Sequence, residues 1–154
     1  MSECHAKKEN PVVKINFRCK NAVLASLAGA LLLAASPVSA LEPIRQEAHI
    51  NNSLRAALVA DQIRKTCPTI DARMIKAWRE LEKLKSYALK KGYNPQTIEA
   101  YVESRDEKRR MRGEAAAWLE GQGAAAGDQV AHCAVGRQEI AKGSLIGQLL
   151  RDKG

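Results

Sequence analysis

The chain has 154 residues and a formal net charge of +8 at pH 7. Residues 41–154 carry 20 Lys and Arg against 15 Asp and Glu, a net charge of +5, so part of the excess belongs to the first 40 residues. The length suits one small domain. The modest positive charge indicates contact with anionic lipid, cell-wall or protein surfaces, or a basic surface without a partner, more than nucleic-acid binding.

The first 40 residues have the pattern of a secretory signal peptide. Basic residues up to Lys20 precede an apolar stretch at residues 22–35, and small side chains precede a cleavage point after Ala40. The apolar stretch is shorter than the roughly 20 residues that span a bilayer, so we favour cleavage over retention as an anchor. We therefore expect residues 1–40 to be a signal peptide with a long basic region, and residues 41–154 to be one periplasmic domain.

Two cysteines follow residue 40, Cys67 and Cys133. Two thiols in one small exported domain usually pair, and closing so long a loop stabilises a fold by about 4 kcal/mol. Free thiols or an intermolecular bond are the alternatives. A zinc site would need His49 or His132, and His132 adjoins Cys133, which is not a usual ligand spacing. We predict a disulfide between Cys67 and Cys133, with no metal and no other cofactor.

The apolar pattern is helical throughout and predicts an all-α bundle of four to five helices. The first helix is expected over about residues 52–66, capped by Asn51, Asn52 or Ser53 and ended by Cys67 before Pro68. Its apolar side is formed by residues 50, 54, 58, 59 and 63.

The second helix is expected to start at a cap from Thr69 or Asp71 and to end at Gly92. Apolar residues recur along it at intervals of three and four, which predicts one buried stripe; its members are Met74, Trp78, Leu81, Leu84 and Ala88. Core packing is the default expectation for Trp78 and for Trp118, and a ligand groove is the alternative.

Asn94 and Pro95 are typical of the start of a third helix, whose apolar side holds Ile98, Tyr101 and Val102. Ser104 and Glu107 match a capping box, so we favour a bend and a new helix there over one continuous helix to residue 120. This helix should bury Met111, Ala115, Trp118 and Leu119, and Gly121 and Gly123 should end it.

The last helical region is expected from about residue 125 to residue 151, with a break at Gly136 or Gly143 and a short final helix capped by Ser144. Its predicted core residues are Val130, Cys133, Ala134, Ile140 and Leu149. Gly143 and Gly147 form a GxxxG pattern. The surrounding charges exclude a spanning helix, so the pattern predicts close packing of a soluble helix or a hinge.

The densest basic stretch is residues 105–112, and its candidate partner-binding residues are Lys108, Arg109, Arg110 and Arg112. They could face an acidic protein or lipid headgroups, or they could be solvated cations on a helix surface. Carboxylates for glycan hydrolysis occur, namely Glu80, Glu82, Glu99, Glu103, Glu114 and Glu120, but none lies in an apolar run that would raise its pKa. We predict no catalytic residues and no enzymatic activity.

Four segments resemble an uncharacterised family of small exported, two-cysteine helical proteins of Rhodobacter-like alphaproteobacteria. They are the signal sequence, residues 64–68 ending in Cys67-Pro68, residues 92–95 ending in Asn94-Pro95, and residues 132–147 from His132 to Gly147. The resemblance covers residues 41–154. Its motifs are structural in character and imply no catalytic or ligand-binding chemistry. Relatives are encoded near subunits of a respiratory complex, which implies an accessory role at the outer face of a membrane complex.

The leading functional hypothesis is therefore a non-catalytic interaction or accessory module in the periplasm. Its partner would be a protein complex or an anionic surface, with at most peripheral membrane contact and no nucleic acid. A periplasmic chaperone of the acid-stress type is the alternative, and a cell-wall-active hydrolase ranks third.

Overall fold

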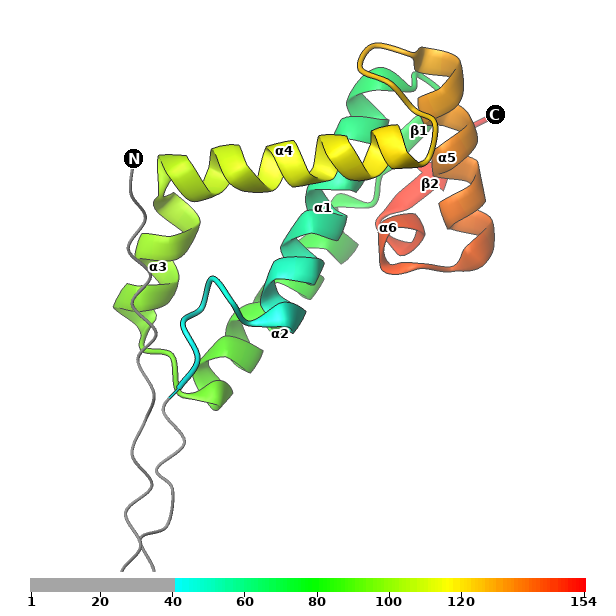
Figure 1. Ribbon diagram of the computed structural model, residues 1–154. Helices are drawn as coiled ribbons and strands as arrows, with labels where there is room; N and C mark the ends of the chain where they lie inside the picture. Colours follow the sequence, from blue (N-terminus) through cyan, green and yellow to red (C-terminus); the bar gives the residue numbers. More distant parts are fainter. Residues whose placement is uncertain (1–40) are drawn as a thin grey trace, which may run out of the picture. The chain divides into compact units, whose positions relative to one another are not determined.

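The computed structural model describes residues 41–154, so the predicted signal peptide lies outside the described residues. The described part is mostly helical, as predicted, but it has six helices instead of four to five, and it contains a two-stranded sheet that the all-α prediction lacked (Figure 1). Its elements are α1 (Ala48–Thr66), β1 (Ile70–Ala72), α2 (Met74–Lys91), α3 (Pro95–Glu103), α4 (Arg105–Gly121), α5 (Gln129–Lys142), α6 (Leu145–Gln148) and β2 (Leu150–Asp152).

Helix α1 is the element around which the others pack: it contacts α2, α4, α5, α6 and β1. One apolar cluster surrounds its C-terminal half, where Val59 and Ile63 meet side chains from α4, α5, α6 and both strands. A second cluster surrounds its N-terminal half, where Ile50 meets the second half of α2, Tyr101 of α3 and Met111 of α4. Helix α4 crosses α1 and reaches both clusters (Figure 1).

The predicted disulfide is present. It joins Cys67, the C-cap of α1, to Cys133 in the first half of α5, with the two Cα atoms 5.1 Å apart. Both cysteines belong to the larger apolar cluster, and Cys67 has no exposed surface. The bond therefore fixes α5 against the end of α1 inside the core.

Helix α1 begins four residues earlier than predicted, and neither Asn51, Asn52 nor Ser53 caps it. The cap is Glu47, whose carboxylate accepts a hydrogen bond from the Ile50 amide at 2.7 Å. Asn51 instead donates its side-chain amide to the carbonyl of Glu47 at 2.7 Å. A Glu is not among the favoured N-cap residues, which is why its role was missed.

The start of α2 also differs from the prediction. Residues 70–72 form β1, which pairs antiparallel with β2, Ile70 opposite Asp152 and Ala72 opposite Leu150. The α2 N-cap is Arg73, without a side-chain cap bond, so neither Thr69 nor Asp71 caps this helix. Strands of three residues leave too short an alternation to be recognised in the sequence.

The predicted division between α3 and α4 is confirmed. The Asn94 side chain caps α3 by accepting from the Thr97 amide, and Ser104 caps α4 by accepting from the Glu107 amide. The two helices meet at a sharp bend (Figure 1). Met111, Ala115 and Leu119 are buried as expected, and Trp118 is partly buried against the core.

The C-terminal region breaks at Gly143, which takes the left-handed conformation, and Ser144 caps α6 as predicted. Helix α5 starts later than expected, after a cap by Asp128. The core prediction for this helix was wrong at Val130, which is 79% exposed, and at Ala134. The disulfide places Cys133 in the core, and His132, Val135 and Gly136 are buried together with it.

Close packing explains why glycine occupies positions 136 and 147. A Cβ on Gly136 would lie 2.8 Å from Cγ2 of Ile63 and 2.5 Å from Cδ1 of Ile70. A Cβ on Gly147 would lie 1.9 Å from the carbonyl oxygen of Glu139. Of the two glycines of the GxxxG pattern, Gly147 therefore marks close packing of α6 on α5, whereas nothing lies within 4 Å of a Cβ on Gly143, which serves as the left-handed end of α5.

Replacing both Cys67 and Cys133 by Ala is expected to lower the free energy of unfolding by about 4 kcal/mol, because the unfolded chain regains the freedom of the closed loop. Urea denaturation of the oxidised protein and of the double variant would measure the difference. A loss below about 1 kcal/mol would contradict a stabilising disulfide.

Gly147→Ala is expected to cost about 1–3 kcal/mol, because its methyl group would meet backbone atoms that cannot yield without moving α5. Gly113→Ala is the matched control: this glycine is inside α4, and nothing lies within 4 Å of its Cβ position. The control should gain about 0.5–1 kcal/mol. Equal effects of the two substitutions in thermal denaturation would refute the packing argument.

Candidate functional site

The first half of the α2 stripe faces solvent. Four large apolar side chains of its first two turns are exposed, and we call them the α2 face: Met74, Ile75, Trp78 and Leu81. Trp78 is 63% and Ile75 71% exposed, so the prediction that Trp78 packs in the core was wrong. Large apolar side chains gathered on a surface in this way are typical of a binding site.

The rest of the stripe is buried, and the reason lies in the neighbours of α1. Leu84 and Ala88 pack in the second cluster, against the N-terminal half of α1. The C-terminal half of α1 is already covered by α4, α5, α6 and the strands. Of the first turns of α2, only Ala77 packs against that cluster, so the larger side chains have no surface left to cover.

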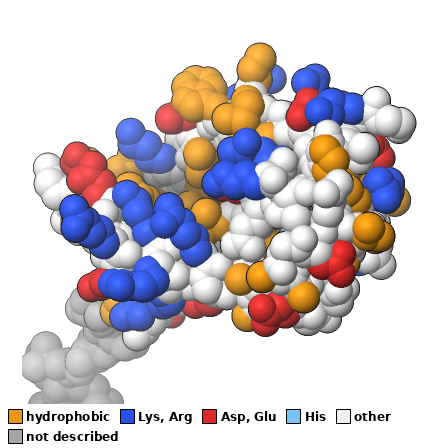
Figure 2. All heavy atoms as spheres, turned by 90° about the horizontal axis from the view of Figure 1, so that it is seen from above, with side chains coloured by type: hydrophobic (Ala, Val, Ile, Leu, Met, Phe, Trp, Pro, Cys, Tyr) orange, Lys and Arg blue, Asp and Glu red, His pale blue; other side chains and the backbone are white. Residues whose placement is uncertain are grey.

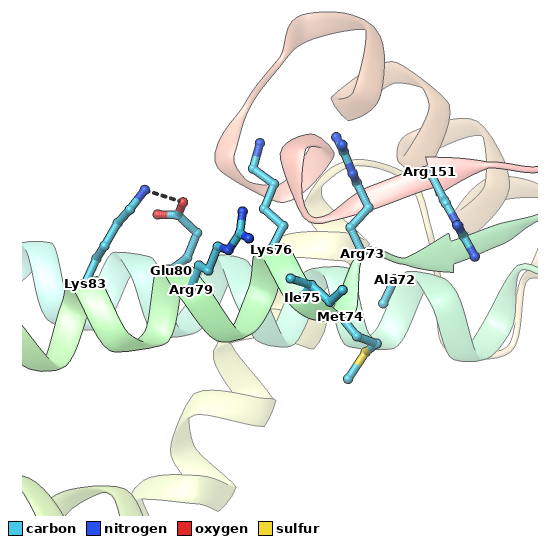
Figure 3. A pocket seen from close by; sticks show the side chains of 9 residues that line it. All are labelled: Ala72, Arg73, Met74, Ile75, Lys76, Arg79, Glu80, Lys83 and Arg151. Atoms are coloured by element: carbon cyan, nitrogen blue, oxygen red, sulfur yellow. Dashed lines mark hydrogen bonds and ion pairs between the residues drawn. The ribbon is translucent and has the colours of Figure 1, made fainter.

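A basic hollow of about 760 Å³ lies beside the α2 face (Figure 3). Its charged lining consists of five cations and one carboxylate: Arg73, Lys76, Arg79, Lys83, Arg151 and Glu80. Glu80 is engaged by Lys83 at 2.8 Å, and Lys76 donates to the side-chain oxygen of Gln148 at 3.1 Å. The hollow therefore keeps a clear excess of positive charge.

The apolar and cationic side chains of α2 lie next to each other, and Met74 and Ile75 of the α2 face also line the basic hollow. In Figure 3 the side chains of Arg73 and Lys76 extend to one side of the helix and Met74 to the other. A space-filling view of one face likewise shows Lys and Arg side chains close together, with exposed apolar side chains beside them (Figure 2). The sequence analysis did not single out these cations, although residues 73, 76, 79 and 83 recur at helical spacing next to the stripe.

The four cations predicted to bind a partner on α4 do not share one environment. Arg110 points inward and bonds to Glu107 at 2.7 Å, to Glu114, and to the Tyr101 hydroxyl at 2.9 Å. Burial alone would lower the pKa of Arg110, but its hydrogen bonds to the two carboxylates raise it above the ordinary value. Arg110 is thus a charged structural link between α3 and α4.

The other three members of that group are exposed. Arg109 pairs with Asp106 one turn earlier. Lys108 and Arg112 have no ion-pair partner among residues 41–154, and both line a separate crevice beside α1. The basic stretch therefore divides into one structural arginine, one locally paired arginine and two cations that remain available.

Among residues 41–154, two carboxylates are buried, Glu47 and Glu139, and the sequence analysis named neither. Desolvation raises the pKa of Glu47, but hydrogen bonds from the Ile50 amide and the Tyr87 hydroxyl, with the charge of Lys91, bring it below the ordinary value. Both carboxylates have structural roles. Glu47 caps α1.

Glu139 receives hydrogen bonds from Ser144 and, at 2.9 Å, from Lys142. Desolvation raises its pKa, but these bonds and the lysine charge lower it overall. A carboxylic acid that protonates a leaving group needs a raised pKa, so neither buried carboxylate suits general-acid chemistry.

His49 and His132, the histidines of the described range, lie in different surroundings. His132 is buried, with Nδ1 2.7 Å from the carbonyl oxygen of Asp128, and His49 meets the Tyr87 ring edge-on at 4.5 Å. Within residues 41–154, no three His, Cys, Asp or Glu side chains gather in a way that could hold a metal ion. In the same range, no helix has the length and apolar character needed to cross a membrane.

Comparison with known proteins assigns the chain to a family without assigning it an activity. The family described as "Family of unknown function (DUF5333)" matches residues 42–151, nearly the whole described range. No curated protein and no solved structure matches the chain significantly.

Glu47→Gln is expected to lower the free energy of unfolding at pH 7 by about 1 kcal/mol, because a neutral amide is a weaker acceptor for Ile50 and Tyr87 than a carboxylate. The folded-state pKa of Glu47 lies below its ordinary 4.5, so its charge stabilises the fold above pH 4.5. That contribution is lost as the pH falls through the folded-state pKa, and the gap between wild type and variant should close there.

Urea denaturation between pH 7 and pH 3 would measure this gap. Glu42→Gln is the control, since Glu42 is exposed and should change stability by less than about 0.5 kcal/mol. A gap for Glu47→Gln that widens on acidification would show that the carboxylate is not stabilising.

Proposed function

Because the chain belongs to the DUF5333 family, whose function is unknown, we propose a role from its surface: it is a non-catalytic interaction module that binds a protein partner through the α2 face and the basic hollow. The exposure of Trp78 among other large apolar side chains carries this proposal. Covering one such side chain in an interface is worth about 1.5–3 kcal/mol, and tryptophan and arginine are the side chains that most often dominate binding energy.

The charges beside the α2 face define the partner's chemistry. Five cations and a single, already paired carboxylate line the hollow, so the partner should border its apolar contact with Asp or Glu side chains. A second copy of this chain would bring like charges together. An apolar helix face bordered by cations could also lie on an anionic bilayer. The crosslinking test below separates the two partners, because a lipid would give no protein adduct.

The periplasm is the proposed compartment. A disulfide inside the core supports an oxidising location, and the signal-like pattern of the first 40 residues supports export. The family resemblance makes a membrane-bound respiratory complex a candidate partner, to which this chain would be an accessory.

A periplasmic chaperone is the second candidate, because a solvent-exposed apolar face could also hold unfolded clients. The two roles differ in selectivity. A chaperone would suppress aggregation of unrelated proteins at low pH, whereas the proposed module would bind one folded partner and leave client aggregation unchanged.

A photo-crosslinking amino acid at position 78 tests the proposal in the native cells, with position 130 as control because Val130 is also exposed and apolar. We expect one adduct from position 78, none of the same mass from position 130, and contact peptides rich in acidic residues. The same adduct from both positions, or none from position 78, would refute the α2 face as the docking site.

Charge reversal provides the quantitative test. Arg79→Glu with Lys83→Glu should weaken binding of the crosslinked partner by about fivefold or more, most strongly at low salt. Arg137→Glu on α5 is the control, because Arg137 is exposed and does not line the hollow. Equal affinities of the two variants would contradict an acidic partner.

A further inference from the structure

A separate crevice of about 300 Å³ opens where α1, α3 and α4 meet. Its walls are mostly aliphatic and come from four helices: Leu54, Ala57 and Leu58 of α1, Leu81 of α2, Val102 of α3 and Met111 of α4. Tyr101 of α3 adds an aromatic ring. Leu81 and Val102 are exposed and Leu54 and Leu58 are partly buried, so the floor is apolar and the mouth is open to solvent.

Three charged residues line the crevice, and all come from α4. Glu107 is already engaged, by Arg110 at 2.7 Å and by Arg45 at 3.3 Å. Lys108 and Arg112 are exposed and have no ion-pair partner among residues 41–154. They are four residues apart on one helix, so their side chains are neighbours and present two positive charges to one ligand.

We propose that this crevice binds an anionic single-chain amphiphile, a medium-chain fatty acid. The alkyl chain would occupy the aliphatic walls, and its carboxylate would lie between Lys108 and Arg112. Guanidinium and ammonium groups both form charge-assisted hydrogen bonds with carboxylates, and each methylene that is buried against the walls strengthens binding. The charges select the headgroup and the apolar walls select the chain.

The volume of the crevice, about 300 Å³, suits one alkyl chain of medium length. The crevice is at the small end of the range for ligand pockets, about 300–1,000 Å³, which favours a single slender chain over a two-chain lipid.

This site is distinct from the proposed protein-binding site. The two share Leu81 but differ in every charged residue that the argument uses. Failure of one proposal therefore leaves the other standing, provided the tests use Lys108 and Arg112 here and the cations of α2 there.

Isothermal titration of the oxidised protein with decanoate below its micelle concentration is the direct test, with chemical-shift mapping of the backbone amides. We expect saturable binding with shifts at α1 and at residues 108–112. Decyltrimethylammonium, which has the same chain and the opposite charge, and butyrate, which has the same headgroup and a short chain, should each bind at least tenfold more weakly.

Variants then test the assigned residues. Lys108→Gln with Arg112→Gln should weaken decanoate binding at least tenfold. Arg105→Gln with Arg109→Gln, an equal charge change at α4 residues that do not line the crevice, should leave it within about twofold. Val102→Phe should also weaken binding by filling the mouth, and because Val102 is 45% exposed, the fold should tolerate the larger side chain.

Three outcomes would overturn the proposal: no saturable decanoate binding, equal binding of the cationic analogue, or equal effects of the two Gln pairs. Co-sedimentation with phosphatidylglycerol vesicles separates a free fatty acid from a bilayer. Stronger dependence of vesicle binding than of decanoate binding on Lys108 and Arg112 would assign these cations to lipid headgroups and would also refute the fatty-acid site.

Discussion

The covalent link between the C-cap of α1 and the first half of α5 determines what the remaining elements can do. Cys67 is fully buried, so the bond lies within the larger apolar cluster. With α5 held there, the chain that follows it returns as α6 and β2, and β2 pairs with β1 directly after Cys67. Gly136 and Gly147 then permit approaches that a Cβ would prevent. One end of α1 is thereby enclosed by the C-terminal third of the chain.

This enclosure explains why α2 carries an exposed apolar face. An amphipathic helix needs a partner along its whole length to bury its stripe. Helix α2 finds one only at its second half, where Leu84 and Ala88 meet the N-terminal half of α1. At its first half the corresponding surface of α1 is already occupied by α5, α6 and the strands. The same packing that stabilises the core therefore creates the surface to which we assign binding.

The polar residues divide into groups that build the fold and groups that remain available. Glu47 caps α1 and accepts from Tyr87 of α2, while Arg110 ties α4 to Tyr101 of α3 and to Asn51 of α1 at 3.1 Å. These links satisfy charged groups that burial would otherwise penalise. Lys108, Arg112 and the cations of the basic hollow contribute no such link between helices, apart from the bond of Lys76 to Gln148. These cations line the basic hollow and the crevice instead.

The sequence alone determined the features that depend on neighbours in the chain. Helical periodicity predicted the helices, Asn94, Ser104 and Ser144 predicted caps, and Gly92 and Gly143 predicted ends. Two cysteines in a chain expected to be exported predicted their pairing. Tertiary structure alone decided which side of each helix is covered. Trp78 and Val130 fit a core pattern and are exposed, whereas Glu47, Glu139 and Arg110 are polar and lie inward. Periodicity shows that a helix has an apolar side, but only the packing of the other helices shows whether anything is left to cover it.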